Sequence, residues 1–440
     1  MDRIYFLAVV LCAVLINALP SLASETKELT LEQAITLAVE KSPELASYSW
    51  EVRSREGRLA QADTLPNPEL EFSIENFWGN KDLHSFDGAE YTLAITQLIE
   101  LGGKRSKRAN VAGIERDLAG WDYEVKKRDL LNEVTKVFVD VIAEQERLKV
   151  TDELYRLAEQ SLNTVAARVQ AGKVSPIEET RASAELSKAR IDLERAKRSL
   201  EAARKRLSTA LGSSVPFFEK AVGQLDLDTD IPSSGQLVQN INKNPDVARW
   251  SAEIGQRRAA LNLERANRIP DPSVSIGVRR LRETETSAMV AGISFPLPLF
   301  NRNSGAVSEA ESRLSKAEEE QKAALLKKHS ALAEAYLALS SAFVEATALK
   351  TSILPGIQSV FDAVQEGYRY GKFGYLDLLD AQRSLSESKR QYIESLAAYR
   401  KAYADVERLT GSGPETYGSA IIKPPRPLPP GERVVVFPRP

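Results

Sequence analysis

Two long stretches of the chain, residues 104–170 and 304–369, carry apolar side chains at helical spacing. The first contains no proline, so it predicts a single helix of roughly 100 Å at 1.5 Å per residue. The second allows a bend at Pro355-Gly356. Seams that step by sevens, or by alternating threes and fours, predict coiled-coil packing of long helices. They comprise Leu186, Ala189, Leu193, Ala196, Leu200, Ala203, Leu207 and Ala210, and then Leu325, Leu332, Ala335, Leu339, Ala342, Ala346, Leu349 and Ile353.

A different period, alternation of apolar and polar residues, follows two pairs of prolines. It predicts strand hairpins over about 69–97 and 273–296, with strands of about ten residues, the length that a tilted strand needs to cross a bilayer. A soluble sheet with one buried face has the same alternation, so the pattern leaves both possibilities open. The alternating apolar residues are Leu70, Phe72, Ile74, Tyr91, Leu93, Ile95, Val274, Ile276, Val278, Met289, Ala291, Ile293 and Phe295.

The two halves of the sequence share one plan. The proline of "KSPELASY" corresponds to that of "KNPDVARW", and the glycines of the two Gly-Lys turns correspond in the same way. We therefore expect repeats over 24–212 and 244–411, joined by a linker over 213–243. Each repeat has a helix, a hairpin, a long helix, a tip turn and a second helix. The tip turns are expected at 171–176 and 370–375, and the helices after them at 175–211 and 376–410.

The expected fold is mostly α, with a small transmembrane β-barrel contribution of four strands per chain. Four strands cannot close a barrel, and an open edge within lipid leaves backbone groups unpaired. The chain must then oligomerise. Two copies give an eight-stranded barrel filled by side chains, whereas three give twelve strands around an aqueous lumen and twelve helical columns.

Composition narrows the possibilities. The charges balance, 59 basic against 61 acidic residues, which gives no reason to expect a nucleic-acid partner. Residues 1–23 read as a secretory signal peptide, and the single cysteine, Cys12, lies inside it, so no disulfide is expected. Beyond the signal there is no apolar run of 18 or more residues. Residues 412–440 form a proline-rich C-terminal tail.

Signals for catalysis or for bound cofactors are lacking. The two histidines, His84 and His329, lie far apart in sequence, so neither a metal site nor a catalytic triad can be assembled. The segment "GGKRS" lacks the spacing of a phosphate-binding loop. Its basic residues, Lys104, Arg105, Lys107 and Arg108, are expected to be a solvated helix start. We therefore expect no enzyme activity and no cofactor.

The most distinctive short stretch is "YRYGKFGYLDLLDAQ", which turns and then places Asp377 and Asp380 just inside a helix. Their i, i+3 spacing puts both carboxylates on one helix face. Acidic residues in a first turn also favour the helix dipole, which is a purely structural explanation.

The order of these marks resembles the TolC-type outer-membrane efflux factors, and most closely their cobalt–zinc–cadmium (CzcC-like) branch. The resemblance covers nearly all of the chain after the signal. Its marks are the junctions "QLIELGGKRSKR" (97–108) and "ISFPLPLFNRNSG" (293–305) and the two Gly-Lys turns.

The resemblance implies a homotrimer in the outer membrane of a Gram-negative bacterium, with a helical tube extending into the periplasm. It implies docking on a periplasmic adaptor protein and an inner-membrane RND-type pump, as a passive exit duct for divalent heavy-metal cations. The linker and the tail would form a belt around the tube. Two alternatives stay open: the same channel exporting drugs or other small organic compounds, and a soluble periplasmic coiled-coil scaffold.

The resemblance also assigns residues to roles. Asp377, Asp380 and Tyr368 would form the pore gate, with the aspartates in stacked acidic rings. One position departs from the family, because Phe373 stands where drug-exporting members keep an arginine of the closing lock. The adaptor-facing tips would comprise Gly172, Lys173, Ser175, Pro176, Gly371, Lys372, Phe373 and Tyr375.

Overall fold

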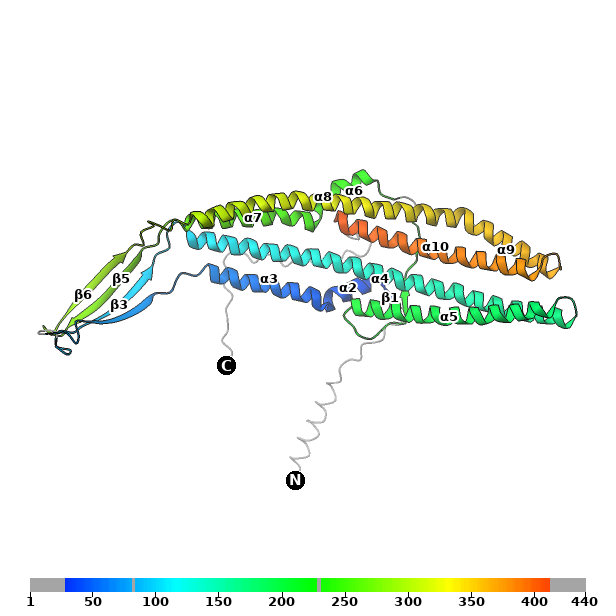
Figure 1. The fold of residues 1–440 in the computed structure, drawn as a ribbon, viewed down its shortest axis with the longest axis horizontal. Coiled ribbons are helices and arrows are strands. Elements are labelled where there is room, and N and C mark those ends of the chain that lie inside the picture. The colour runs from blue at the N-terminus through cyan, green and yellow to red at the C-terminus, as the bar shows by residue number, and fades with distance from the viewer. Residues whose placement is uncertain (1–27, 81–83, 228–230, 412–440) are drawn as a thin grey trace, which may run out of the picture.

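The computed structural model of the chain describes residues 28–80, 84–227 and 231–411. The expected signal peptide (1–23) and proline-rich tail (412–440) lie outside the described residues. The described part is elongated, with a long slab of helices at one end and an open four-stranded sheet at the other (Figure 1).

The elements of the first half follow one another along this axis. They are β1 (Glu28–Thr30), α2 (Leu31–Lys41), α3 (Pro43–Ala62), β2 (Glu69–Glu75), β3 (Glu90–Leu98), α4 (Lys104–Gln170) and α5 (Pro176–Ala210). Local sequence explains several helix starts, because a proline at the first helical position is preceded by a side chain that caps the helix. The capping residues are Ser42 for α3, Ser175 for α5 and Asn244 for the later helix α7.

The second half begins with the linker, which contains β4 (Lys220–Val222), α6 (Ser234–Asn240) and a 3₁₀ turn, η2 (Ile241–Lys243). It continues with α7 (Pro245–Ala266), β5 (Ser273–Leu281), β6 (Thr286–Ser294), α8 (Ser304–Ala348), a π-helical segment η3 (Leu349–Ile353), α9 (Leu354–Arg369) and α10 (Tyr375–Thr410). Strand β4 pairs with β1 in parallel, with Leu29 opposite Ala221, and so ties the linker to the start of the described chain.

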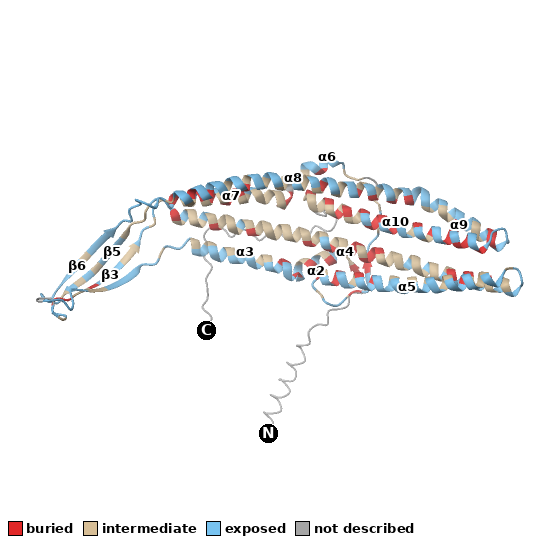
Figure 2. Cartoon of the chain, in the orientation of Figure 1, coloured by how far each residue is buried: buried red, intermediate tan, exposed pale blue. Residues whose placement is uncertain are grey.

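Helix α4 is the centre of the slab. Next to the sheet it packs against α3 and α7, and toward the far end against α5 and α10. Helix α8 packs on α7 and α10, so the slab has two long edges, one formed by α8 and α9 and the other by α3 and α5. Figure 2 shows exposed residues along α5 and α8, whereas α4 is mostly half-buried or buried.

The predicted helical seams are borne out along α5 and α8, where Leu193, Leu207, Leu332 and Leu339 are all buried. The last position of the second seam is wrong, because Ile353 is 42% exposed. The π-helical segment inserts one extra residue there, and the buried side of the helix resumes one residue later. It continues at Leu354, Ile357 and Phe361.

The irregularity in this helix begins before the expected bend at Pro355-Gly356. A proline at 355 has no N–H to donate to the carbonyl of Thr351, so the preceding turn cannot close in the α-helical pattern. The run Ser304–Arg369 is the one helix of the described residues that is long and apolar enough to cross a membrane by length and composition. Several of its apolar residues instead pack in the slab with α10, where Leu332, Leu339 and Ala342 meet Tyr399 and Ala402.

The sheet has the order β2-β3-β5-β6, with every neighbouring pair antiparallel. Register places Phe72, Leu93, Val278 and Met289 in one row across it. These side chains are 61%, 52%, 51% and 75% exposed, so the described chain does not bury the apolar face of its own sheet. Phe295, expected within the last strand, lies just beyond it, since β6 ends at Ser294 before Pro296.

A half-buried charge cluster joins four helices near the middle of the slab. Asp246 of α7 accepts hydrogen bonds from Arg408 Nη1 (2.6 Å) and Lys328 Nζ (2.5 Å), and Arg408 Nε also donates to Asp129 of α4. Burial by itself would raise the pKa of Asp246, but the hydrogen bonds from the two cations outweigh it, and the pKa is lowered. The cluster therefore ties α10, α8 and α4 to the start of α7.

Candidate functional site

The end of the slab farthest from the sheet consists of two helical turns of matching geometry. Gly371 between α9 and α10 and Gly172 between α4 and α5 have φ angles of 75° and 68°. In each turn the lysine after the glycine donates its backbone N–H to a carbonyl five residues back, at 2.8 Å for Lys372 and 2.9 Å for Lys173. A left-handed glycine with this hydrogen bond is a common helix C-terminal motif, so both tips are hydrogen-bonded turns.

Most of the residues expected at the adaptor-facing tips are exposed in the described structure. They are Gly172, Lys173, Ser175, Pro176, Gly371, Lys372 and Phe373. Tyr375 is the exception. It is 3% exposed, its ring lies 6.3 Å from that of Tyr368, and it packs in a core with Leu378 and Val165. The first turn of α10 directs this ring inward between the helices, so Tyr375 differs from the other tip residues in the described chain.

The two aspartates expected at the gate lie exposed on α10. Asp377 also has a local structural role, since its Oδ2 accepts the backbone N–H of Gly374 at 2.8 Å and so caps the helix start. Asp380 lies close enough to Arg383 to contribute to its raised pKa, which is due first to the hydrogen bond from Arg383 to Glu185. Of the two aspartates, Asp380 therefore has the smaller structural role, because Asp377 also caps the helix.

Tyr368, the third residue expected at the gate, is 3% exposed within the single chain. Burial raises the pKa of its hydroxyl. It thus lies behind the surface that carries Asp377 and Asp380, in the packing between the two tips. The resemblance led us to expect this tyrosine at the gate, whereas its orientation depends on contacts with the neighbouring α4.

Arg168, in the last turn of α4, was not identified from the sequence. Its Nη1 donates to the backbone carbonyl of Tyr368 at 2.9 Å, and its guanidinium carbon lies 4.6 Å from the centre of the Tyr368 ring. One arginine thus satisfies a terminal carbonyl of α9 and stacks on a buried ring. The only available signal was a basic residue placed directly before a helix stop.

Further contacts hold α10 to the first pair of helices. Arg383 donates to both carboxylate oxygens of Glu185 on α5, at 3.3 and 2.8 Å, and Gln382 donates to Ser161 of α4 at 3.3 Å. Phe373 lies over α9 at Gly367, where an added Cβ would come within 2.2 Å of the Phe373 ring. At position 373, where drug-exporting members of the family keep an arginine, this chain therefore has a phenylalanine that packs against α9.

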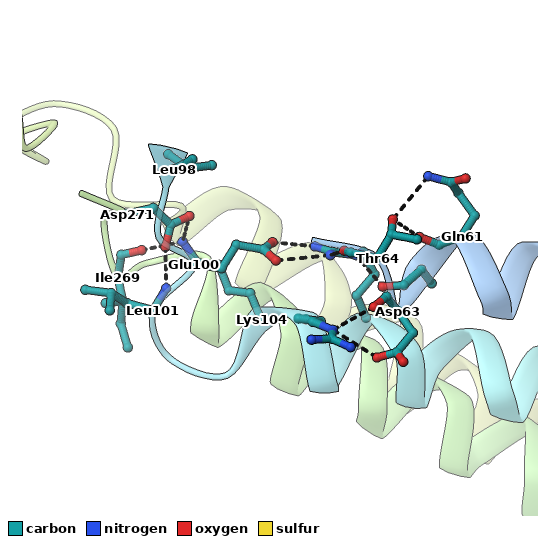
Figure 3. A network of polar contacts seen from close by, with 12 residues as sticks. Gln61, Asp63, Thr64, Leu98, Glu100, Leu101, Lys104, Ile269 and Asp271 are labelled. Atoms are coloured by element: carbon teal, nitrogen blue, oxygen red, sulfur yellow. Dashed lines mark hydrogen bonds and ion pairs between the residues drawn. The ribbon is translucent and has the colours of Figure 1, made fainter. Parts of the chain in front are cut away.

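The opposite end of the slab has a polar junction with the sheet, shown in Figure 3. Lys104 Nζ donates to Ile269 O (2.5 Å) and Asp271 Oδ2 (2.7 Å), and Asp271 Oδ1 accepts from Leu101 N (2.8 Å). Arg108 binds both oxygens of Glu100. The expected solvated helix start was wrong for Lys104, which is 8% exposed because the connection between α7 and β5, with Ile269 and Asp271, lies against it.

A helical slab with two tip turns, joined through a polar junction to a sheet whose apolar face the described residues leave uncovered, is the protomer plan of outer-membrane efflux channels. The chain belongs to the outer membrane efflux protein family, which it matches over residues 34–213 and 237–412. This confirms the family and the location in the outer membrane.

Two relatives are described as metal-resistance proteins of Cupriavidus metallidurans. The chain is 35% identical over 383 residues to the cobalt-zinc-cadmium resistance protein CzcC, covering 87% of this chain and 90% of that protein. It is 31% identical over 291 residues to the nickel and cobalt resistance protein CnrC, covering 66% and 67% of the two chains.

A solved structure supports the mostly α fold. The crystal structure of a membrane protein from Pseudomonas aeruginosa superposes with a TM-score of 0.75 at 20% identity, covering 89% of this chain and 92% of that one.

Proposed function

We propose that three copies of the chain close into a channel with a twelve-stranded barrel and a tube of twelve helical columns. The support is geometric. Strands β2 and β6 are the two edges of the sheet, and the slab has one edge at α3 and α5 and another at α8 and α9. A head-to-tail contact between unlike edges closes a ring, and it leaves no strand edge unpaired in lipid.

The proposed closure uses two internal repeats. The order α3, β2, β3, α4, α5 recurs as α7, β5, β6, α8 with α9, α10. Three copies of a two-repeat chain then supply six similar units around the pore. The segment over 213–243 links the repeats, and its described part carries β4, which pairs with β1.

The sheet would face lipid with its apolar side and the lumen with its polar side. The lipid side carries the row of Phe72 and Met289, whereas the opposite side carries Glu71, Thr92 and Arg279. Arg279 donates to Glu90 at 2.9 Å and to Thr92 at 3.0 Å, so this cation is neutralised within the polar face.

We infer that the channel is the exit duct of a tripartite pump for divalent heavy-metal cations. The observation that carries this inference is the 35% identity to a cobalt-zinc-cadmium resistance protein over most of both chains. The exposed Asp377 and Asp380 support it, because three copies would place acidic rings at the periplasmic entrance, and such rings attract cations. The exposed tips, with Lys173 and Lys372, would meet a periplasmic adaptor that links the channel to an inner-membrane RND-type pump.

The test is growth of a strain that lacks the gene, on zinc, cobalt, cadmium, nickel, copper and silver salts and on a panel of dyes and antibiotics. Sensitivity to metals alone, restored by the gene on a plasmid, is the expected result. Sensitivity to organic compounds alone would overturn the metal assignment and leave the channel. A chain that is water-soluble without detergent would overturn the channel and favour a periplasmic scaffold.

A further inference from the structure

The segment that joins β6 to α8 exposes more apolar surface than the other connections of the sheet. We name residues 295–300, "FPLPLF", the apolar hook. Its Phe295, Leu297, Leu299 and Phe300 are 59%, 75%, 65% and 100% exposed. On the other junction, Ile99 and Leu101 are 41% and 38% exposed, and Lys104 and Asp271 fix the backbone beside them. The hook therefore needs a partner that the residues described by the structure do not supply.

We propose that the hook inserts into the periplasmic leaflet of the outer membrane and marks the lower limit of the lipid-facing band. This inference rests on the proposed barrel. It assigns the hook one partner, the acyl chains of phospholipid, in preference to a second copy of the chain.

Length supports this partner. The upper limit of the apolar face is the row that contains Arg280 and Ser287, and β6 ends at Ser294. Seven steps of about 3.4 Å along a strand tilted by about 40° span about 18 Å of membrane. An apolar band of about 25 Å therefore needs about three further residues, which reach Leu297. Strand β6 is therefore too short to span the apolar band, and the apolar hook supplies the missing length.

The backbone chemistry of the hook also suits lipid. Pro296 and Pro298 have no N–H to leave unpaired, and the N–H of Leu299 donates to the carbonyl of Leu297 at 2.9 Å. Irregular backbone in lipid is destabilised by each unpaired polar group, so a six-residue segment with two prolines loses less than an ordinary loop.

Charges follow the apolar hook directly. Arg302 and Arg268 are exposed, and Arg268 Nε donates to the carbonyl of Arg302 at 3.3 Å, which holds the two residues together. Guanidinium groups bind phosphate oxygens, so this pair would lie at the level of the lipid head groups once the hook is in the acyl region.

Spin labels on single cysteines test the proposal. The chain has one cysteine, Cys12, in the segment expected to be removed, so Cys12→Ser gives a cysteine-free background. Leu297→Cys and Phe300→Cys are labelled in the full protein in phospholipid vesicles, and collisions with oxygen and with a water-soluble nickel chelate are compared. These side chains are exposed, so the substitutions leave the fold intact.

At both positions we expect the spin label to collide with oxygen at a rate severalfold higher than with the nickel chelate. Low collision with both reagents would show packing against another copy, and high collision with nickel would show water. Either outcome overturns the proposal. Lys316→Cys, on the exposed side of α8, is the water control, and Met289→Cys is the control for the barrel. If Met289 is also outside lipid, the proposed function fails; if only the hook is outside, this inference alone fails.

Discussion

Arg168 Nη1 lies 2.9 Å from the backbone carbonyl oxygen of Tyr368, and this contact joins the end of the first long helix to the end of the second. Because α4 and α9 belong to different halves of the chain, the contact holds the two tips at a fixed spacing. A motion that separates α9 and α10 from α4 and α5 must break it, together with the pair of Arg383 on α10 and Glu185 on α5.

Replacing Arg168 with glutamine is therefore expected to favour opening of the proposed entrance. Loss of a charge-assisted hydrogen bond of about 1.5 kcal/mol would raise the open fraction roughly tenfold. Single-channel recording in planar bilayers measures this. Arg369→Gln is the matched control, because Arg369 is also a basic residue in a last helical turn but is exposed. Equal open fractions for wild type and Arg168→Gln would exclude a latch at this contact.

Neutralising the aspartates should weaken cation preference. Asp380→Asn removes a charge from an exposed position, whereas Asp377→Asn retains an oxygen that can still accept from Gly374. Reversal potentials in a salt gradient are expected to move toward those of an unselective pore in each variant, and furthest in the double variant. An unchanged reversal potential in the double variant would remove both residues from the gate.

The cluster around Asp246 predicts a pH dependence of stability. The pKa of this carboxyl is lower in the folded than in the unfolded chain, so its stabilisation is full above the unfolded value of about 3.9 and is lost as the pH falls through the folded value. Asp246→Asn should lower the free energy of unfolding by about 2–3 kcal/mol at pH 7. Denaturation followed by circular dichroism measures this difference.

The gap between wild type and Asp246→Asn should narrow as the pH falls below about 4, since the wild-type carboxyl then becomes neutral as well. Asp192→Asn, at a more exposed ion pair on α5, is the control and is expected to change little at either pH. A gap that stays constant with pH would mean that packing, not charge, explains the effect.

The junction in Figure 3 predicts strong coupling between Lys104 and Asp271. Lys104→Met leaves the carboxylate without its cation and is expected to destabilise the protein by about 3 kcal/mol, while the double variant with Asp271→Asn should recover part of that loss. The free energy of unfolding of the single and double variants gives the coupling energy. Arg105 and Asp63, whose side chains are 44% and 57% exposed, form the control pair, expected to couple by less than about 1 kcal/mol. Equal coupling in both pairs would contradict a special role for the buried lysine.

Features that depend on neighbouring residues along the chain could be predicted from the sequence. Lack of proline over 104–170 and the apolar period of the α5 seam indicate long helices, because helical hydrogen bonds and side-chain faces repeat locally. The alternation in the strands indicates the sheet, and the Gly-Lys turns indicate the tips, since a left-handed residue at a helix end favours glycine.

Only the tertiary structure decided which surfaces meet. Tyr368 and Tyr375 turn inward because α4 presents Val165 and Arg168 to them, and Lys104 is buried because Asp271, 167 residues away, lies beside it. The exposure of the apolar face of the sheet also depends on the tertiary structure. The alternation of apolar and polar residues defines two faces of a strand, but it does not say which face is covered. Local periodicity is a property of the chain, whereas burial depends on distant residues that only folding brings together.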